Sequence, residues 1–261
     1  MNEVNKTLYI PLYGKAYVSR KGMILEDKSA ERIWDSVNFS LKGKSKSKWL
    51  AYYMGMRSRV FDDWVRERVL EDANGIIIHL GCGLDSRAER VGANCLWYDV
   101  DFPDVIEERH RYFKESDQYK MIGSDIRDRA WLDVVKKGVR ATVIIEGVSM
   151  YLTPDELSDV LSMISERFDS ISLLMDCYTT FAARASKVKN PINDVGVTMV
   201  YGIDDPRAIE VGCLGFVKEH EMTPDSLINE LSGMEKVIFR KVYGGKMSKK
   251  LYRLYEYKKY L

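Results

Sequence analysis

This sequence of 261 residues predicts an α/β protein in which helices cover both faces of a doubly wound, mostly parallel sheet. Segments of strand character alternate with helical segments from residue 76 onward, which is the order of parallel strands joined by crossover helices. Four of the five residues in 76–80 are aliphatic, as expected of a central strand that is buried on both faces. A Gly-x-Gly turn, Gly81-Cys82-Gly83, follows directly and precedes a helix start, so a ligand can lie against its backbone.

Composition and charge exclude several functions. The net charge of +1 gives no general attraction to nucleic acid or to anionic membranes, and the 3 histidines are too scattered for a metal site. The 4 cysteines form no C-x-x-C pair, which favours free thiols in a reducing compartment. No signal peptide is recognisable, and no apolar run approaches the roughly 20 residues that a membrane span needs. We therefore expect a cytoplasmic protein that binds neither metal, nucleic acid nor membrane.

Residues 1–72, ahead of the first strand, are expected to form a helical region. Asp27 or Ser29 could cap a short helix there, and the basic segment 42–48 is typical of a solvated loop. Apolar residues recur every three or four positions across 49–65 and predict a long amphipathic helix.

Two arginines on this long helix have two possible roles. Arg57 and Arg59 lie close to Asp62 and Asp63, and a spacing of about four residues favours ion pairs on the helix surface. On this spacing alone, we expect both arginines to be surface residues rather than ligands.

The remaining elements follow in regular order after the Gly-x-Gly turn. Further strands are predicted at 95–100, 119–122, 141–145, 171–175, 216–222 and 251–257. Helices are predicted from Pro103, over 131–138, from the capping box Thr153-Pro154-Asp155-Glu156 and from Thr223-Pro224-Asp225. Residues 178–215 show weak periodicity and are expected to form an irregular, partly helical insertion. No linker divides the chain, so we expect one integrated domain over 73–261 behind the N-terminal region.

Residues suited to a nucleoside cofactor lie at the predicted strand ends. Ligands of doubly wound sheets bind beyond the carboxyl ends of the strands. Gly81, Asp101, Asp125 and Glu146 each end or follow a predicted strand. Asp101 is placed to accept both ribose hydroxyls, and Asp125 with Ile126 could hold the adenine. An acidic residue at a strand end can instead cap the next helix, and for Asp125 the two roles stay open.

The turn does not suit a dinucleotide. A dinucleotide fingerprint needs a third Gly or Ala where this chain has Ser86, and Asp85 adds a negative charge where a pyrophosphate would sit. This disfavours an NAD-dependent oxidoreductase. A cofactor with an adenosine and a positive centre fits better, and S-adenosylmethionine is the common one. Asp99 competes with Asp101 for the ribose, but we expect Asp99 to face the other way along the strand.

Four segments resemble the leucine carboxyl methyltransferase family. The turn at 80–87 (LGCGLDSR) resembles the family's LG-G-LDTR motif, with Ser86 in place of the commoner Thr. The segments 97–106 (WYDVDFPDVI), 146–154 (EGVSMYLTP) and 56–62 (MRSRVFD) resemble its vDfPeVi, EGvlmYLtp and aRtr-iD motifs. The similarity covers most of the chain and is greatest to the bacterial branch that resembles the tetracenomycin polyketide-synthesis O-methyltransferases.

This resemblance implies the class I S-adenosylmethionine-dependent methyltransferase fold, with a seven-stranded sheet, an N-terminal helical lid over 1–72 and an insertion after the fifth strand. It also implies that Arg57 binds the methionine carboxylate of the cofactor instead of lying at the surface. Glu146 or its neighbouring backbone would approach the α-amino group, Gly81 would line the methionine and Asp101 the ribose. The full set of implied cofactor-binding residues is Arg57, Gly81, Cys82, Gly83, Asp101, Phe102, Asp125, Ile126, Glu146 and Gly147.

The resemblance further implies O-methyl transfer to a small molecule, polyketide-like or another metabolite, by in-line displacement without a metal ion. A carboxylate acceptor is already ionised at neutral pH, whereas a hydroxyl acceptor needs a base within hydrogen-bond reach. The candidates for such a base are His110, His220 and Tyr151, of which Tyr151 follows the fourth strand near the expected mouth of the pocket. Because candidates for a general base are few, the sequence favours a carboxylate acceptor, and a hydroxyl acceptor stays an alternative.

Two further expectations concern the residues that form the acceptor pocket and a possible function without catalysis. The N-terminal helices and the insertion 178–215 would form the lid and the acceptor pocket. The alternative to an enzyme is a protein of the same fold that binds S-adenosylmethionine without transfer, as a sensor or a partner subunit.

Overall fold

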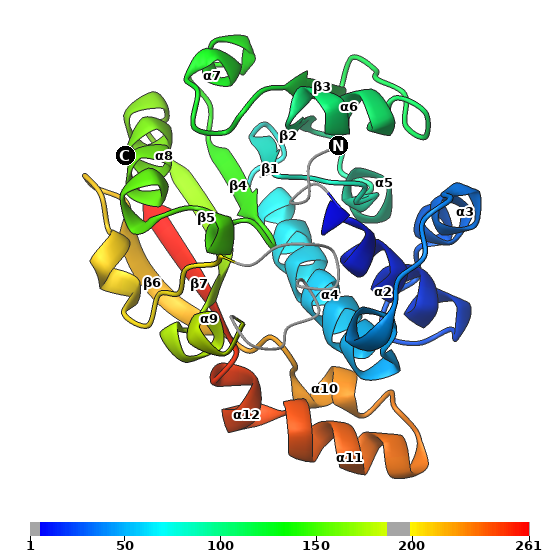
Figure 1. Ribbon diagram of the computed structural model, residues 1–261. Helices are drawn as coiled ribbons and strands as arrows, with labels where there is room; N and C mark the ends of the chain where they lie inside the picture. The colour runs from blue at the N-terminus through cyan, green and yellow to red at the C-terminus, as the bar shows by residue number, and fades with distance from the viewer. Residues whose placement is uncertain (1–5, 187–198, 261) are drawn as a thin grey trace.

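The computed structural model describes residues 6–186 and 199–260 and places a seven-stranded sheet at the centre of the molecule (Figure 1). The strands are β1 (Ile76–Leu80), β2 (Leu96–Asp101), β3 (Tyr119–Gly123), β4 (Ala141–Ile145), β5 (Ile171–Tyr178), β6 (Gly215–His220) and β7 (Tyr252–Lys259). Their spatial order is β3-β2-β1-β4-β5-β7-β6, in which β7 runs antiparallel to both neighbours and the other pairs are parallel. The predicted strands and the doubly wound, mostly parallel sheet are confirmed.

Helices flank the sheet in the expected alternation. The N-terminal region contains α2 (Tyr9–Arg20), α3 (Lys28–Ser36), the 3₁₀ turn η1 (Gly43–Lys46) and α4 (Lys48–Glu71). Between the parallel strands lie α5 (Arg87–Val91), α6 (Pro103–Arg109), α7 (Ala130–Val134), η2 (Ser149–Tyr151) and α8 (Pro154–Arg167). After β5 follow α9 (Thr180–Ser186), η4 (Pro206–Ile209), α10 (Asp225–Ile228), α11 (Gly233–Tyr243) and α12 (Gly245–Lys249).

Both faces of the sheet are buried, because successive side chains of a strand point to opposite sides. Ile77 of β1 lies on the face that α4 covers with Phe61 and Trp64. Ile78 lies on the opposite face, against Trp131 of α7 and residues of α8. Every residue of β1 is therefore buried, which explains the continuous aliphatic run in the sequence.

The N-terminal helices form a second layer around α4. In Figure 1, α4 lies against the sheet, and α2 and α3 lie on its outer side. Asp27, rather than Ser29, caps α3, because its side chain accepts a 2.7 Å hydrogen bond from the backbone N–H of Ala30. The basic segment 42–48 contains η1, and its lysines at 42, 44 and 46 are exposed, as predicted for a solvated segment.

Two helix predictions meet different outcomes. The capping box of α8 is confirmed, since the side chain of Thr153 accepts from the N–H of Glu156 and the carboxylate of Glu156 accepts from the N–H of Thr153. The helix predicted over 131–138 is shorter than expected. It ends at Val134, because Val135 adopts an extended backbone conformation and still packs into the core.

The segment 178–215, predicted as an insertion, is partly helical where the structure describes it. It begins with the last residue of β5 and contains α9 and η4, whereas residues 187–198 lie outside the described residues. Within the described ranges, no helix combines the length and the apolar character needed to cross a membrane.

Candidate active site

The carboxyl ends of the parallel strands bring the predicted cofactor residues together in one row. The register of β1 with β2 and β4 places Gly81 between Asp101 and Glu146. Strand β3 adds Asp125 beyond Asp101, and β5 adds Asp176 beside Glu146. The strand order reverses between β1 and β4, which is where sheets of this class bind ligands.

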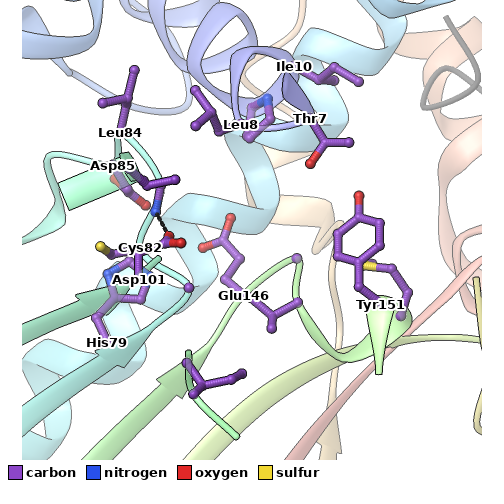
Figure 2. Close-up of a pocket in the computed structure, with 18 of the residues that line it drawn as sticks. Thr7, Leu8, Ile10, His79, Cys82, Leu84, Asp85, Asp101, Glu146 and Tyr151 are labelled. Carbon is purple, nitrogen blue, oxygen red and sulfur yellow. Dashed lines mark hydrogen bonds between the residues drawn. The ribbon is translucent and has the colours of Figure 1, made fainter. Parts of the chain in front are cut away.

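A cavity of about 400 Å³ opens over this row of strand ends. All ten residues predicted to bind the cofactor line it, and so does Tyr151. In Figure 2, Asp101 and Cys82 lie on one side of Glu146, and Thr7 and Tyr151 lie on the other. The cavity thus has one side over β2 and β3, where the residues predicted to bind a nucleoside lie, and a second side between α2 and η2.

The Gly-x-Gly turn adopts a backbone that favours glycine. Gly81 and Gly83 have φ angles of +66° and +52°. A Cβ atom on Gly81 would lie 2.2 Å from Cγ2 of Val148, so the backbone passes directly beside the loop that follows β4. Cys82 between the two glycines is buried, and burial raises the pKa of its thiol, which makes it a poor nucleophile. The turn therefore provides close backbone approach rather than reactive groups.

Asp101 is held by the turn itself. Its Oδ2 accepts a 2.7 Å hydrogen bond from the N–H of Gly83, which Figure 2 marks with a dashed line, and its Oδ1 accepts a 2.8 Å bond from Phe102. Burial raises the pKa of Asp101 in spite of these bonds. Each carboxylate oxygen can accept more than one hydrogen bond, so both remain able to bind hydroxyl groups of a ligand.

Asp99 does not compete for the cavity, although the predicted reason was wrong. Residues two apart on a strand lie on the same face, so Asp99 shares the side of Asp101 instead of facing away. Its carboxylate accepts from the guanidinium of Arg109 and from the hydroxyl of Tyr119. Arg109 also donates to the backbone carbonyl of Gly83 at 2.7 Å, so this pair supports the turn from behind.

Asp125 and Ile126 form the part of the cavity furthest along the sheet. Asp125 accepts from the backbone N–H of Arg127 and pairs with the Arg127 guanidinium at 2.6 Å, and these contacts lower the pKa of the carboxyl. Ile126 is buried beside it. Asp125 therefore does not cap the next helix, since α7 begins at Ala130 with Arg129 as its N-cap; it holds Arg127 and lines the cavity.

Arg57 lies inside the molecule and is only 4% exposed, so the expectation of a surface ion pair is wrong for this residue. Its Nε donates to Glu146 and its Nη1 to Asp176, both at 2.9 Å. No described residue accepts from Nη2, and a Cβ on Gly147 would lie 3.4 Å from that atom. Because Arg57 lines the cavity, Nη2 is the group left to bind an anion there.

The surface pair predicted from spacing forms at Arg59 instead. Its Nε lies 2.8 Å from Asp63, and both side chains are partly exposed. Residues two apart on a helix point about 200° apart, so Arg57 faces the sheet while Arg59 faces out. Asp62 is also buried, and it pairs with Arg87 and Arg90 of the α5 region rather than with its own helix.

Two carboxylates at the centre of the cavity are neutralised by arginines and a lysine. Burial raises the pKa of Glu146, but Arg87 and Arg57 outweigh this and lower it to about 2. Asp85 lies 3.1 Å from Lys15 and also contacts arginines at 87 and 90. Because its charge is compensated, Asp85 is a weaker argument against a phosphate ligand than the sequence suggested.

Several residues at the cavity escaped the sequence analysis. Lys15 of α2 is 3% exposed and lines the cavity, although a lysine on a helix is normally a surface residue. Tyr178 and Tyr252 line the second side, with ring centroids 4.5 Å apart. Asp176, which holds Arg57, did carry a signal: it is the one charged residue in the otherwise apolar or neutral run of β5.

The predicted candidates for a general base differ in position. His110 is exposed, and His220 lies 2.7 Å from Glu256 on β7; neither lines the cavity. Tyr151 lines the cavity, but burial raises the pKa of its hydroxyl, so the hydroxyl stays protonated at neutral pH and does not supply a base.

Comparisons with known proteins identify relatives of this chain. The family model described as leucine carboxyl methyltransferase matches residues 11–165. The chain is 29% identical over 238 residues to the tetracenomycin polyketide synthesis O-methyltransferase TcmP of Streptomyces glaucescens, covering 89% of this chain and 88% of that protein. It is 30% identical over 250 residues to the S-adenosyl-L-methionine-dependent methyltransferase dpfgK of Gibberella zeae, covering 83% and 81%.

Solved structures show the same fold at low sequence identity. A candidate methyltransferase of Thermobifida fusca aligns over 95% of this chain and 94% of its own, with a TM-score of 0.58 and 15% identity. The magnesium protoporphyrin IX methyltransferase ChlM of Synechocystis, solved with S-adenosylhomocysteine, aligns over 88% and 92% with a TM-score of 0.52 and 14% identity. This chain has the class I methyltransferase fold, uses S-adenosylmethionine as its cofactor, and belongs to the leucine carboxyl methyltransferase family.

Proposed function

We propose that this enzyme transfers a methyl group from S-adenosylmethionine to an oxygen atom of a small molecule, with a carboxylate as the favoured acceptor. The observation that carries the proposal is a single cavity that joins the predicted cofactor residues to a side lined by Tyr151, Tyr178 and Tyr252. A cofactor on the first side and an acceptor on the second would meet near Glu146.

The residues present suit the cofactor. Nη2 of Arg57 and the ammonium group of Lys15 would bind its carboxylate, and Asp101 would accept from the ribose. Gly81 would let the methionine portion pass close to the backbone, because any side chain there would meet Val148. When bound, the cofactor supplies a methyl group on a positively charged sulfur. The protein contributes the orientation of the two reactants.

The choice of a carboxylate acceptor rests on the state of the acids that line the cavity. Among the described lining residues, every carboxylate is already engaged: Asp85 by Lys15, Asp101 by backbone N–H groups, Asp125 by Arg127 and Glu146 by two arginines. Burial raises the pKa of Tyr151 and of Tyr252, so these hydroxyls are donors rather than bases. His79 also lines the cavity, but its Nε2 lies 3.3 Å from Nη1 of Arg87 and is taken up by that contact. Donors without a free base suit an acceptor that is already an anion.

The regions around the cavity have complementary roles in this proposal. Residues 1–72 act as the lid, since Thr7, Ile10 and Leu50 line the cavity from that region. The segment 178–215 contributes to the acceptor side through Tyr178. The four cysteines form no disulfide, which supports a cytoplasmic location.

A test of the proposal uses S-adenosylmethionine that carries an isotope label in its methyl group. We expect label transfer to small aromatic or aliphatic carboxylic acids, and mild alkali should then release labelled methanol, because methyl esters hydrolyse in alkali and methyl ethers do not. Label that survives alkali would instead identify a hydroxyl acceptor.

The alternative function is binding without transfer, as a sensor or partner subunit. It predicts affinity for S-adenosylhomocysteine without label transfer to any acid or phenol. Absence of binding, measured by isothermal titration, would contradict both functions.

A further inference from the structure

Charged side chains, four of which line the cavity, form one continuous series of ion pairs that joins the N-terminal helices to the sheet. Lys15 pairs with Asp85, Asp85 contacts Arg87, and Arg87 continues to Glu146. No side chain in the chain of pairs is more than 7% exposed. We call it the buried ion network; its members are Lys15, Arg57, Arg87, Arg90, Asp27, Asp62, Asp85, Glu146 and Asp176.

The buried ion network has one more negative charge than positive charges. Among the described residues that it connects, four are cations and five are carboxylates. His79 touches the network through its Nε2, which lies 3.3 Å from Nη1 of Arg87, and because a guanidinium only donates, Nε2 accepts in this contact. Asp99 and Arg109 pair with each other and leave the balance unchanged. An unmatched charge at this depth is unfavourable and attracts a cation.

Asp176 is the member with the least compensation. Its Oδ2 accepts from Nη1 of Arg57, an arginine that Glu146 shares, and its Oδ1 accepts a 2.6 Å hydrogen bond from the N–H of Gly147. No second cation among the described residues pairs with it. Burial and the neighbouring Glu146 raise the pKa of Asp176 in spite of Arg57, which is the electrostatic cost of this unmatched carboxylate. Arg57 and Gly147 both line the cavity, so the surplus charge lies at the end of the cavity that would hold the methionine portion.

The methyl donor and its product differ in charge at that end. S-adenosylmethionine carries a carboxylate, an ammonium and a sulfonium, with a net charge of +1. After transfer the sulfur keeps the electron pair of the broken S–CH₃ bond, so S-adenosylhomocysteine is neutral overall. The donor therefore completes the charge balance of the buried ion network, and the product leaves one negative charge unmatched.

We propose that Asp176, through this unmatched charge, makes the site select the sulfonium form of its cofactor over the thioether product. Asp176 does not line the cavity, so it acts through Arg57, Gly147 and the electric field rather than by contact. As a consequence, methyl transfer lowers the affinity of the site for the cofactor, because the bound donor becomes neutral S-adenosylhomocysteine. This inference rests on the proposed cofactor site.

The test compares two unreactive ligands by isothermal titration: sinefungin, which carries an amino group in place of the sulfonium methyl, and S-adenosylhomocysteine. We expect the wild-type protein to bind sinefungin roughly tenfold more tightly, because a unit charge within the site interacts strongly at low effective dielectric. Equal affinities, or tighter binding of S-adenosylhomocysteine, would overturn the inference while leaving the cofactor site intact. Failure of both ligands to bind would overturn the cofactor site as well.

The variant Asp176→Asn tests whether Asp176 causes the preference for sinefungin over S-adenosylhomocysteine. It removes the charge and keeps the shape, so we expect the affinity ratio to fall towards one through weaker sinefungin binding. A purely structural role would weaken both ligands equally, and an unchanged ratio would overturn the assignment to Asp176. The matched control is Glu256→Gln, which removes a buried carboxylate on β7 outside the buried ion network and should keep the wild-type ratio. The wild-type comparison decides the inference even where Asp176→Asn fails to fold.

Discussion

The Nε atom of Arg57 lies 2.9 Å from Oε1 of Glu146, although the two residues are 89 positions apart in the sequence. One comes from helix α4 and the other from the end of strand β4, and both line the same cavity. Removing one partner of such a buried pair leaves an uncompensated charge, whereas removing an exposed partner costs little.

Substitution of Arg57 therefore tests the cofactor site. Arg57→Lys keeps the positive charge but cannot donate hydrogen bonds to Glu146 and Asp176 from two separate nitrogen atoms. We expect the affinity for S-adenosylhomocysteine, measured by isothermal titration, to fall by about tenfold or more. Arg59→Ala on the same helix removes an exposed ion pair and should change the free energy of unfolding by about 0–1 kcal/mol, with no effect on affinity. Equal effects of the two variants would show that Arg57 does not bind the cofactor.

A side chain at Gly81 should be harmful for two separable reasons. In Gly81→Ala, the positive φ angle costs about 1–2 kcal/mol, and the clash with Cγ2 of Val148 adds about 1–3 kcal/mol of overpacking. The double variant Gly81→Ala/Val148→Ala should recover the second part only. Urea denaturation of both variants, with Val148→Ala alone as the reference, measures the difference. No recovery in the double variant would mean that strain of the backbone, and not the clash, dominates.

Asp101→Asn should weaken cofactor binding. An amide has a single acceptor oxygen, so its NH₂ group would face either the N–H of Gly83 or that of Phe102, which now both donate to the carboxylate. The turn would shift and one acceptor for the ribose would be lost. We expect roughly tenfold weaker binding of S-adenosylhomocysteine, and the exposed Asp117→Asn should bind as the wild type does. Retained affinity in Asp101→Asn would contradict the assignment to the ribose.

Stability in acid should depend on Glu256. Burial raises the pKa of this carboxyl, but the hydrogen bond with His220 and the charges of His220 and Lys218 outweigh it and lower the pKa to about 2. A pKa that is lower in the folded state stabilises the fold above the ordinary glutamate pKa of about 4.3, and this contribution is lost as the pH falls towards 2. It amounts to about 3 kcal/mol at most.

The corresponding measurement compares the wild type with Glu256→Gln by urea denaturation at several pH values. The variant should be less stable near pH 6, and the difference should shrink between about pH 4.5 and pH 2. A difference in the free energy of unfolding that stays constant over this range would show that the pKa of Glu256 is not lowered.

The parts of the fold that could be predicted are those that local sequence determines. The strand β1 is buried on both faces, so its aliphatic run identified it without any knowledge of its neighbours. The cap at Thr153 could be predicted because all its contacts lie within four residues. Gly81 and Asp101 could be predicted because they directly follow or end strands, and parallel strands end at the same edge of the sheet.

The parts that could not be predicted depend on the pairing of distant segments. Arg57 and Arg59 have the same local surroundings in sequence, and only the packing of α4 on the sheet separates the buried one from the exposed one. Lys15 becomes a cavity residue only because Asp85 from the loop after β1 meets α2. The shortened α7 follows from the packing of Val135 in the core, which overrides its local helical pattern.

The ion pairs of Lys15 with Asp85 and of Asp27 with Arg90 tie the N-terminal helices to the loop that carries the cofactor turn. Members of a family that differ in acceptor are natural sources for chimeric enzymes, in which the N-terminal segment of one is joined to the sheet of another. In this chain the segment brings both part of the cavity wall and one partner of each of these buried pairs. A chimera that exchanges the segment must therefore match the charges at positions 15 and 27 with those at 85 and 90, so that acceptor preference and cofactor affinity are inherited together.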